Sequence, residues 1–503
     1  MKPAFPIAGL AGLAGMLAAL LPGRVLVRGD DFGYLETVVE TVRRGAWTPS
    51  DWLEPFNLPL PILSLGLHAV TGNLWLATFG LNAAIFLSVY LLLRRWLRPA
   101  TAGGELGLLA LAVFPVWLNK GVEYTGVPLG VALTLAALLA WRRGRHRWFF
   151  AVVLLAVANR QSAVCLLALP VVELIRCWRT GRGLSRELAA GIALTAGATL
   201  ALAGWWPVNF ARVVAAARWR EEFSATRLAG NLVLGVVILA GLLACWRGWH
   251  GHSWRAAVRA NLARPALPLL LTLAGAWLVL GEPVVLACET PGWERAGSLL
   301  LVAATFLGAW AISWRFPLEP GFVACAGAYV ALVAFRGQWW DYYFLEPAVV
   351  LLGAGDAGTA SPSPLTHWIR GAGMVALAVA AVFLGRFLQR TEQQIVAYES
   401  ALRAGTVAIT EASDAPFGYL AWKLFPTARA HPEPQPRLTD FLRYVEGGRG
   451  RVVGDSIVVD REGGRRSLHP SREKRPLPPA WRGREFPLSA AEWRQYLERV
   501  SAR

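Results

Sequence analysis

The chain has 503 residues, of which 55% are hydrophobic and only 17% are charged, and its formal net charge is +17. Soluble domains carry charge on about a quarter of their residues, so this composition excludes an ordinary soluble protein. It predicts an all-α polytopic membrane protein with about 11 to 13 transmembrane helices, because runs near the length that spans a bilayer recur along the chain. The apolar runs cover about 6–27, 74–93, 105–119, 126–141, 148–176 (two short or broken spans), 187–206, 228–246, 266–281, 296–313, 320–335, 344–355 and 371–388.

The excess positive charge lies in short loops between these runs. If the N-terminus is cytoplasmic and the runs alternate, the arginine clusters fall on one side of an inner or plasma membrane, as the positive-inside rule describes. This pattern accounts for the charge without nucleic-acid binding. The clusters lie within 94–98, 142–147, 176–186 and 247–264. The same alternation places outside the cytoplasm residues 28–73, the loops near 119–127, 207–227, 282–295 and 336–343, and the tail from 390 onward.

The first run ends at an acidic pair, Asp30 and Asp31. We interpret this run as a retained span rather than a signal peptide, because cleavage would leave the pair on a free end with no helix to position it. The pair is either a hydrated helix end or a catalytic group. In the second interpretation, one carboxylate acts as a general base on a hydroxyl within hydrogen-bond reach, and repulsion between the neighbours lets one hold a proton more readily.

The first outer loop, residues 28–73, has an organisation of its own. Apolar side chains recur at helical spacing from Phe32 to Val42, which predicts an amphipathic helix lying in the membrane interface. A second apolar stretch, Leu58 to Val70, predicts another short interfacial helix. Between the two, Trp47 and Trp52 are typical of an interfacial aromatic belt.

Further along the chain, charged and aromatic residues near the outer side are candidates for substrate binding. Arg160 interrupts an apolar stretch and is either functional or a snorkelling loop arginine. Lys120 and Glu123 share the predicted outer side with Asp30, and Glu123 is equally well explained as a solvated loop charge. Arg336 and Tyr343 flank an aromatic segment that suits a sugar or prenyl contact, or an ordinary interfacial belt.

Metal and disulfide signatures are weak. None of the five cysteines has a CxxC spacing, and the histidines are scattered. No cofactor is required. A divalent metal at the acidic pair is compatible with the sequence but not demanded by it.

The predicted organisation is a membrane domain over residues 1–389 and a soluble extracytoplasmic tail over 390–503. The sequence of the tail predicts a small α+β or partly ordered unit. Its expected elements are strands at 405–410 and 451–459 and a helix at 487–499.

The stretch Asp30-Asp31-Phe32-Gly33-Tyr34 resembles the acidic-pair-then-tyrosine motif of membrane glycosyltransferases of the C fold (GT-C). It is most similar to the branch of protein mannosyltransferases and lipid A aminoarabinose transferases. Asn57 to Leu63 and Thr71 to Trp96 are also similar to that branch, and the resemblance covers about residues 1–180. Two positions depart from the family pattern, since Asp31 stands where Glu is usual and Asn57 where Lys or His often occurs.

The resemblance implies transfer of a sugar from a polyprenyl-phosphate carrier to an acceptor hydroxyl outside the cytoplasm. Asp30 then matches the catalytic base, Asp31 its supporting neighbour and Tyr34 the motif tyrosine. The partners would be the lipid-linked donor, an unidentified lipid, glycan or protein acceptor, and membrane lipids. Two other functions stay open: a transporter or flippase of lipid-linked glycans, and a non-catalytic scaffold of envelope assembly.

Overall fold

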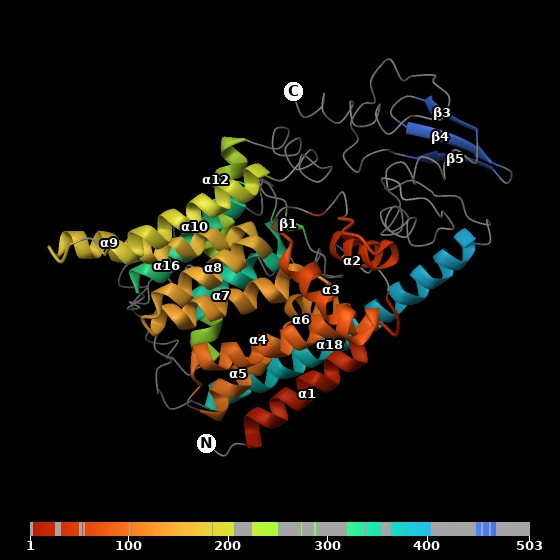
Figure 1. Cartoon of the computed structure of the whole chain (residues 1–503). Helices are drawn as coiled ribbons and strands as arrows, with labels where there is room; N and C mark the ends of the chain where they lie inside the picture. Colours follow the sequence, from red (N-terminus) through yellow and green to blue (C-terminus); the bar gives the residue numbers. More distant parts are fainter. Residues whose placement is uncertain are drawn as a thin grey trace.

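The computed structural model describes the chain over a set of segments that carries most of the predicted spans (Figure 1). Nearly all of the described residues before the tail are helical. The segments are residues 4–25, 32–49, 53, 56–99, 101–183, 185–205, 224–249, 273, 286–287, 319–335, 339–353, 364–403, 449–453, 456–461 and 464–468. The runs predicted at 266–281 and 296–313 lie almost entirely outside them, so the count of 11 to 13 spans stays a prediction.

The first half of the chain forms two short helices on one side of a bundle of longer ones (Figure 1). The elements up to residue 179 are α1 (Ala4–Leu20), α2 (Phe32–Arg44), α3 (Pro59–Thr71), the π-helical turn η1 (Leu76–Gly80), α4 (Leu81–Leu97), α5 (Ala102–Ala112), α6 (Pro115–Val122), α7 (Gly126–Arg142), α8 (His146–Asn159), the 3-10 turn η2 (Gln161–Leu167) and α9 (Ala168–Arg179). The two short helices predicted in the first outer loop are therefore confirmed as α2 and α3, and their position in the membrane interface stays a prediction.

The second half adds longer helices and a pair of short strands. These elements are α10 (Arg186–Trp205), α12 (Ala225–Trp249), β1 (Leu286–Ala287), α16 (Pro320–Ala334), β2 (Trp339–Trp340), the 3-10 turn η3 (Asp341–Phe344), α17 (Leu345–Leu352) and α18 (Pro364–Arg403). The strands β1 and β2 pair in parallel. Helix α18 runs alongside α1 and is much longer than any other helix drawn (Figure 1).

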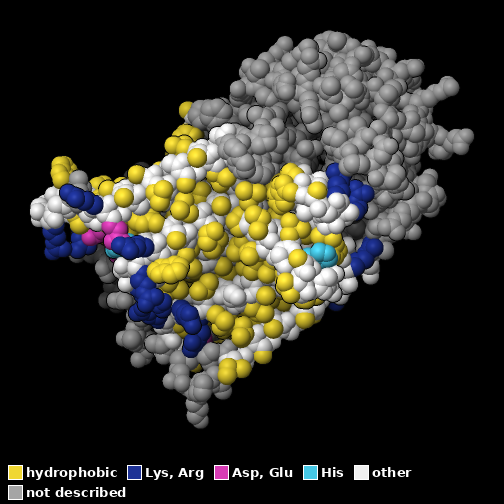
Figure 2. Space-filling view, viewed as in Figure 1, with side chains coloured by type: hydrophobic (Ala, Val, Ile, Leu, Met, Phe, Trp, Pro, Cys, Tyr) yellow, Lys and Arg dark blue, Asp and Glu magenta, His cyan; other side chains and the backbone are white. Residues whose placement is uncertain are grey.

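Four stretches of the described chain are long and apolar enough to cross a membrane, and a bent pair makes a fifth. The four are Leu76–Leu97, Gln161–Arg179, Arg186–Gly204 and Arg370–Arg390. Side chains on α10 and α18 such as Leu200 and Phe383 are 73% and 66% exposed. Hydrophobic side chains cover most of the face in Figure 2, with Lys and Arg gathered at its margins. A surface this apolar is stable only against lipid or another protein.

Two predicted spans are broken, and each break has a local cause. The run at 105–119 divides into α5 and α6, which meet at an angle of 57°, because Pro115 has no N–H to continue the ladder of helical hydrogen bonds. The run at 148–176 divides at Arg160, whose backbone is extended (φ −151°, ψ 120°), so the prediction of a broken span is confirmed there. The apolar span within α18 ends at Arg390, and the helix itself continues past the predicted tail boundary to Arg403.

One end of the bundle is held by an arginine and a tryptophan. The Trp96 indole N–H donates to the Val349 carbonyl at 2.9 Å, which ties α4 to α17. The Arg142 guanidinium lies 3.8 Å from the centre of the Trp96 ring. It also donates to the carbonyl oxygens of Trp96 and Gly353 at 2.9 and 2.6 Å. Nearby on α4, Arg94 pairs with the buried Glu105 at 2.9 Å. We call this the Arg142 end.

In the tail, three strands form an antiparallel sheet, β3 (Arg449–Val453), β4 (Ser456–Arg461) and β5 (Gly464–Leu468). The single strand predicted over 451–459 is wrong. It is two antiparallel strands, with Val453 opposite Ser456, and the sequence between them is Gly-Asp, two residue types that disfavour strands. The strand expected at 405–410 and the helix at 487–499 lie outside the described residues.

Candidate functional site

At the other end of the bundle, four separate elements meet around the side chain of Asn57. Helix α2 brings Tyr34, whose hydroxyl lies 2.9 Å from the Asn57 amide. In the orientation that satisfies its neighbours, this amide donates to Tyr34 Oη and to the main-chain oxygens of Phe56 and Asn159, the last two at 3.1 Å. Helix α7 begins beside them, since a side chain at Gly126 would lie 2.9 Å from Tyr34 Oη. The predicted interfacial helix is thereby fixed to the ends of α7 and α8.

The break after α8 presents a charged group next to this cluster. Arg160 Nε lies 3.2 Å from Oε1 of Glu346, and the two side chains are 14% and 6% exposed. The Ser162 hydroxyl donates to the other carboxylate oxygen, Oε2, at 2.8 Å. Asn159, just before the break, donates to the Gly126 carbonyl at 2.8 Å. An arginine that merely extends its side chain to water would not be held by two side chains in this way. We call the end of the bundle that carries this ion pair the Glu346 end.

Only a residue without a side chain fits where this ion pair crosses α7. A Cβ on Gly130 would lie 2.7 Å from Cδ of Arg160 and 2.9 Å from Oε1 of Glu346, closer than side chains pack. Gly130 therefore lets both charged groups lie directly against the helix backbone. Glu346 itself comes from the first turn of α17, ahead of Pro347.

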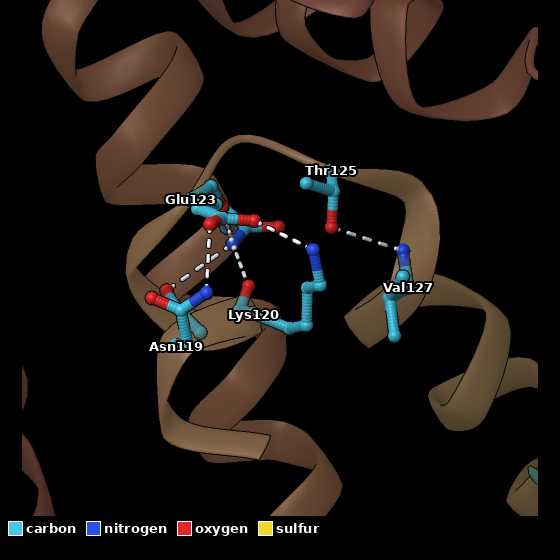
Figure 3. A network of polar contacts seen from close by, with 7 residues as sticks. Asn119, Lys120, Glu123, Thr125 and Val127 are labelled. Carbon is cyan, nitrogen blue, oxygen red and sulfur yellow. Dashed lines mark hydrogen bonds and ion pairs between the residues drawn. The ribbon is translucent and has the colours of Figure 1, made fainter. Parts of the chain in front are cut away.

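A second buried ion pair lies at the end of α6 (Figure 3). Lys120 Nζ is 2.8 Å from Oε2 of Glu123, and the two residues are only 1% and 4% exposed. Asn119 donates to Oε1 of Glu123 at 2.7 Å, and the amide of Asn82 on α4 donates to the main-chain oxygens of Lys120, Gly121 and Glu123. The interpretation of Glu123 as a solvated loop charge is wrong, because the chain turns inward here and every carboxylate oxygen has a donor.

The segment after Glu123 connects the Lys120–Glu123 ion pair to the cluster around Tyr34. Thr125 caps α7 by accepting a hydrogen bond from the Val127 amide at 3.3 Å (Figure 3). Its neighbour Tyr124 is fully buried, lies 2.6 Å from the Ser64 hydroxyl of α3 and packs edge-on against Tyr34. Burial raises the pKa of the Tyr124 hydroxyl well above its usual range, so this phenol stays neutral and acts as a hydrogen-bonding group.

The structure therefore brings together Tyr34, Arg160, Lys120 and Glu123 at one end of the bundle, through α2, α6, α7 and α8. Tyr343 lies in η3, three residues before Glu346, half-buried against the α12–α16 side of the bundle. Asp30, Asp31 and Arg336 lie outside the described residues. In the sequence, Asp31 immediately precedes Phe32, the first residue of the helix that carries Tyr34.

Sequence reasoning missed Glu346, Ser162 and Gly130. Glu346 precedes Pro347 at the head of an apolar run, where a loop-facing carboxylate would be expected, but it is 5% exposed and paired. A usable signal was the acid at the head of an apolar run, since a buried carboxylate requires a partner. For Ser162, the available signal was its position two residues after Arg160. The need for glycine at position 130 cannot be predicted from the sequence, because it depends on the side chains of neighbouring helices.

Within the described residues, no group of three or more His, Cys, Asp or Glu side chains has the arrangement of a metal site. What the Glu346 end offers chemically is a cation held by a carboxylate, surrounded by amide and hydroxyl groups. Such a group can bind an anion or orient a polar substrate where the helices end.

No protein-family model matches the chain, and no curated protein matches it. The likeness of the Asp30–Tyr34 segment to the C-fold glycosyltransferases therefore depends on the motif residues themselves.

Proposed function

We propose that this protein is a membrane glycosyltransferase with a GT-C-like fold that uses a polyprenyl-phosphate sugar donor and acts at the Glu346 end of the bundle. One observation carries the proposal. Arg160, a cation enclosed by Glu346 and Ser162, lies at the same end as Tyr34, which anchors the helix that directly follows Asp30 and Asp31. We infer that the base and the cation, the two groups that the reaction needs, act together at this end.

The chemistry divides between these groups. Asp30 takes the proton of the acceptor hydroxyl. The acceptor oxygen forms a bond to the anomeric carbon as the bond from that carbon to the carrier phosphate breaks, and the electron pair leaves on the phosphate oxygen. Charge grows on that phosphate in an oxocarbenium-like transition state. Arg160, with Lys120 more deeply placed, supplies positive potential for the departing phosphate.

The orientation follows from charge. The Arg142 end carries the arginine-rich turns after α4, α7 and α9, whose Arg143, Arg145 and Arg179 side chains are exposed. By the positive-inside rule this end faces the cytoplasm. The Glu346 end then faces outward, where acceptors of an envelope or secretory compartment are found.

The test replaces Asp30 by Asn in the full-length protein and measures sugar transfer from a panel of polyprenyl-phosphate sugars in membranes. We expect a loss of at least about 100-fold, the contribution of a positioned general base. The matched control is Asp51→Asn, an aspartate of the same predicted outer loop that should retain transfer. Undiminished transfer by Asp30→Asn would remove Asp30 as the base.

A transporter of lipid-linked glycans is the second candidate, because discontinuous helices with charged groups at the break are typical of transporter sites. The interrupted α8–α9 pair has this form, with Arg160 at the break, and the bent α5–α6 pair is also discontinuous. Movement of a labelled lipid-linked sugar across reconstituted vesicles, with no transfer by wild-type protein from any donor, would favour this candidate.

A further inference from the structure

The carboxylate of Glu346 occupies a position that the proposed substrate also requires. It lies 3.2 Å from Nε of Arg160, and the Ser162 hydroxyl holds its second oxygen at 2.8 Å. Ser162 lies two positions after Arg160, beyond the extended backbone of that residue, so both groups that hold Glu346 come from the same break in the chain. An anion arriving at Arg160 must therefore compete with a carboxylate already in place.

The charge of the lipid changes during the proposed reaction. A sugar-bearing polyprenyl phosphate is a phosphodiester with one negative charge, whereas the released carrier is a monoester with a charge of about −1.5 to −2 near pH 7. An unopposed arginine binds the product more tightly than the donor, since charge-assisted hydrogen bonds strengthen with the charge of the acceptor. Such a site would be inhibited by its own product.

We propose that Glu346 is a built-in competitor that keeps the Arg160 site exchangeable, so that the phosphomonoester carrier leaves after transfer. Glu346 is a positioning residue: it acts on the lipid phosphate through Arg160. Its role in turnover rests on the proposed function, but its competition with a phosphomonoester for Arg160 does not.

Two neighbours make this exchange feasible. Gly130 has no side chain that would wedge between the carboxylate and the guanidinium as they lie against the α7 backbone. Ser162 keeps a donor on Glu346 when Arg160 turns to another anion, which lowers the cost of leaving that buried carboxylate unpaired.

The chain supplies a matched control at the opposite end. Arg94 and Glu105 form a second arginine–glutamate pair, with Nε and Oε1 2.9 Å apart and the carboxylate fully buried. Glu105→Gln makes the same chemical change as Glu346→Gln, at the Arg142 end. Any general effect of losing a buried carboxylate appears in both variants, whereas an effect on the Arg160 site appears in one.

The experiment measures the affinity of the full-length protein in detergent for farnesyl phosphate, a short phosphomonoester probe, with farnesol as the uncharged reference. We expect Glu346→Gln to bind farnesyl phosphate about tenfold more tightly than wild type, the scale of one charged hydrogen bond. Glu346→Asp should remain near wild type, Glu105→Gln should be unchanged, and Arg160→Gln should bind more weakly. Farnesol binding should not vary across the series.

Ser162→Ala provides a milder test that preserves both charges. Removing the hydroxyl weakens the hold on Glu346 and should tighten farnesyl phosphate binding by about two- to threefold. Unchanged or weaker binding in both Glu346→Gln and Ser162→Ala, with melting temperatures showing folded protein, overturns the inference. Wild-type protein that does not bind farnesyl phosphate at all overturns it as well.

Transfer assays separate this inference from the proposed function. In an active enzyme, the released carrier should inhibit Glu346→Gln at lower concentration than wild type, with kcat reduced and the KM for the donor not raised. If the farnesyl phosphate series behaves as expected but no variant or wild type transfers sugar, the proposed function fails and the competition at Arg160 stands.

Discussion

The two ends of the bundle use arginine in opposite ways. At the Arg142 end, the guanidinium lies on the Trp96 ring and donates to main-chain carbonyls of α4 and the residue after α17. Main-chain acceptors cannot leave without unfolding a helix end, so this arginine is a fixed clamp. At the Glu346 end, Arg160 is held by a side-chain carboxylate that can rotate away. The difference teaches that the role of a bound cation depends on its partner, which is a set of main-chain oxygens at one end and a side-chain carboxylate at the other.

The largest expected effect tests whether the Glu346 end also carries stability. Lys120→Met leaves Glu123 buried with Asn119 as its remaining side-chain donor, and breaking a buried ion pair costs about 3–5 kcal/mol. We expect a matching fall in the free energy of unfolding measured by SDS titration. The double variant Lys120→Met with Glu123→Leu should recover most of the loss. Equal stability of the single variant and wild type would contradict a packed ion pair.

A pair of glycine substitutions compares the ends directly. Gly130→Ala places a methyl group 2.7 Å from Cδ of Arg160, and Gly353→Ala places one against the indole nitrogen of Trp96. Both should lower the free energy of unfolding by about 1–3 kcal/mol, the usual cost of overpacking. Only Gly130→Ala should change the affinity for farnesyl phosphate. An equal change in farnesyl phosphate affinity in both variants would contradict the proposed difference between a structural arginine at one end and an exchangeable one at the other.

A smaller effect is expected at the anchor of α2. Tyr34→Phe removes the hydroxyl that meets Asn57, at a cost of about 1 kcal/mol in stability. Because the acidic pair directly precedes this helix, transfer should fall by more than the loss of stability explains. Sugar transfer at a temperature where both proteins are folded is the measurement. Trp47→Phe, an exposed aromatic change after the same helix, is the control and should leave transfer unchanged.

The smallest effect is expected on the solvent side of the Arg142 end. Arg147 and Glu187 are 3.5 Å apart, with side chains 89% and 50% exposed. Pairs of this kind contribute little after solvent screening, so Arg147→Gln should change the melting temperature by no more than experimental error. A clear loss of stability would mean that exposed arginines at this end are structural, as Arg142 is.

Several features of the fold follow from the sequence because they are local. The apolar runs predicted helices, the spacing from Phe32 to Val42 predicted α2, and Arg160 within an apolar stretch marked the break between α8 and α9. Pro115 inside an apolar run is also a local signal for a bend, although the run at 105–119 was predicted as one span. The separation of β3 from β4 was missed because the Gly-Asp sequence between them lies in a run of β-branched residues that was interpreted as one strand.

The sequence by itself determined that this chain is helical, strongly apolar and charged at segment ends, because helix formation and transfer into lipid depend on composition over one or two turns. Only the tertiary structure decided which charges are paired. Glu346 and Arg160 are 186 positions apart and meet because α7, α8 and α17 pack together across Gly130. Burial removes water from each charge, and this cost selects partners that no local pattern encodes.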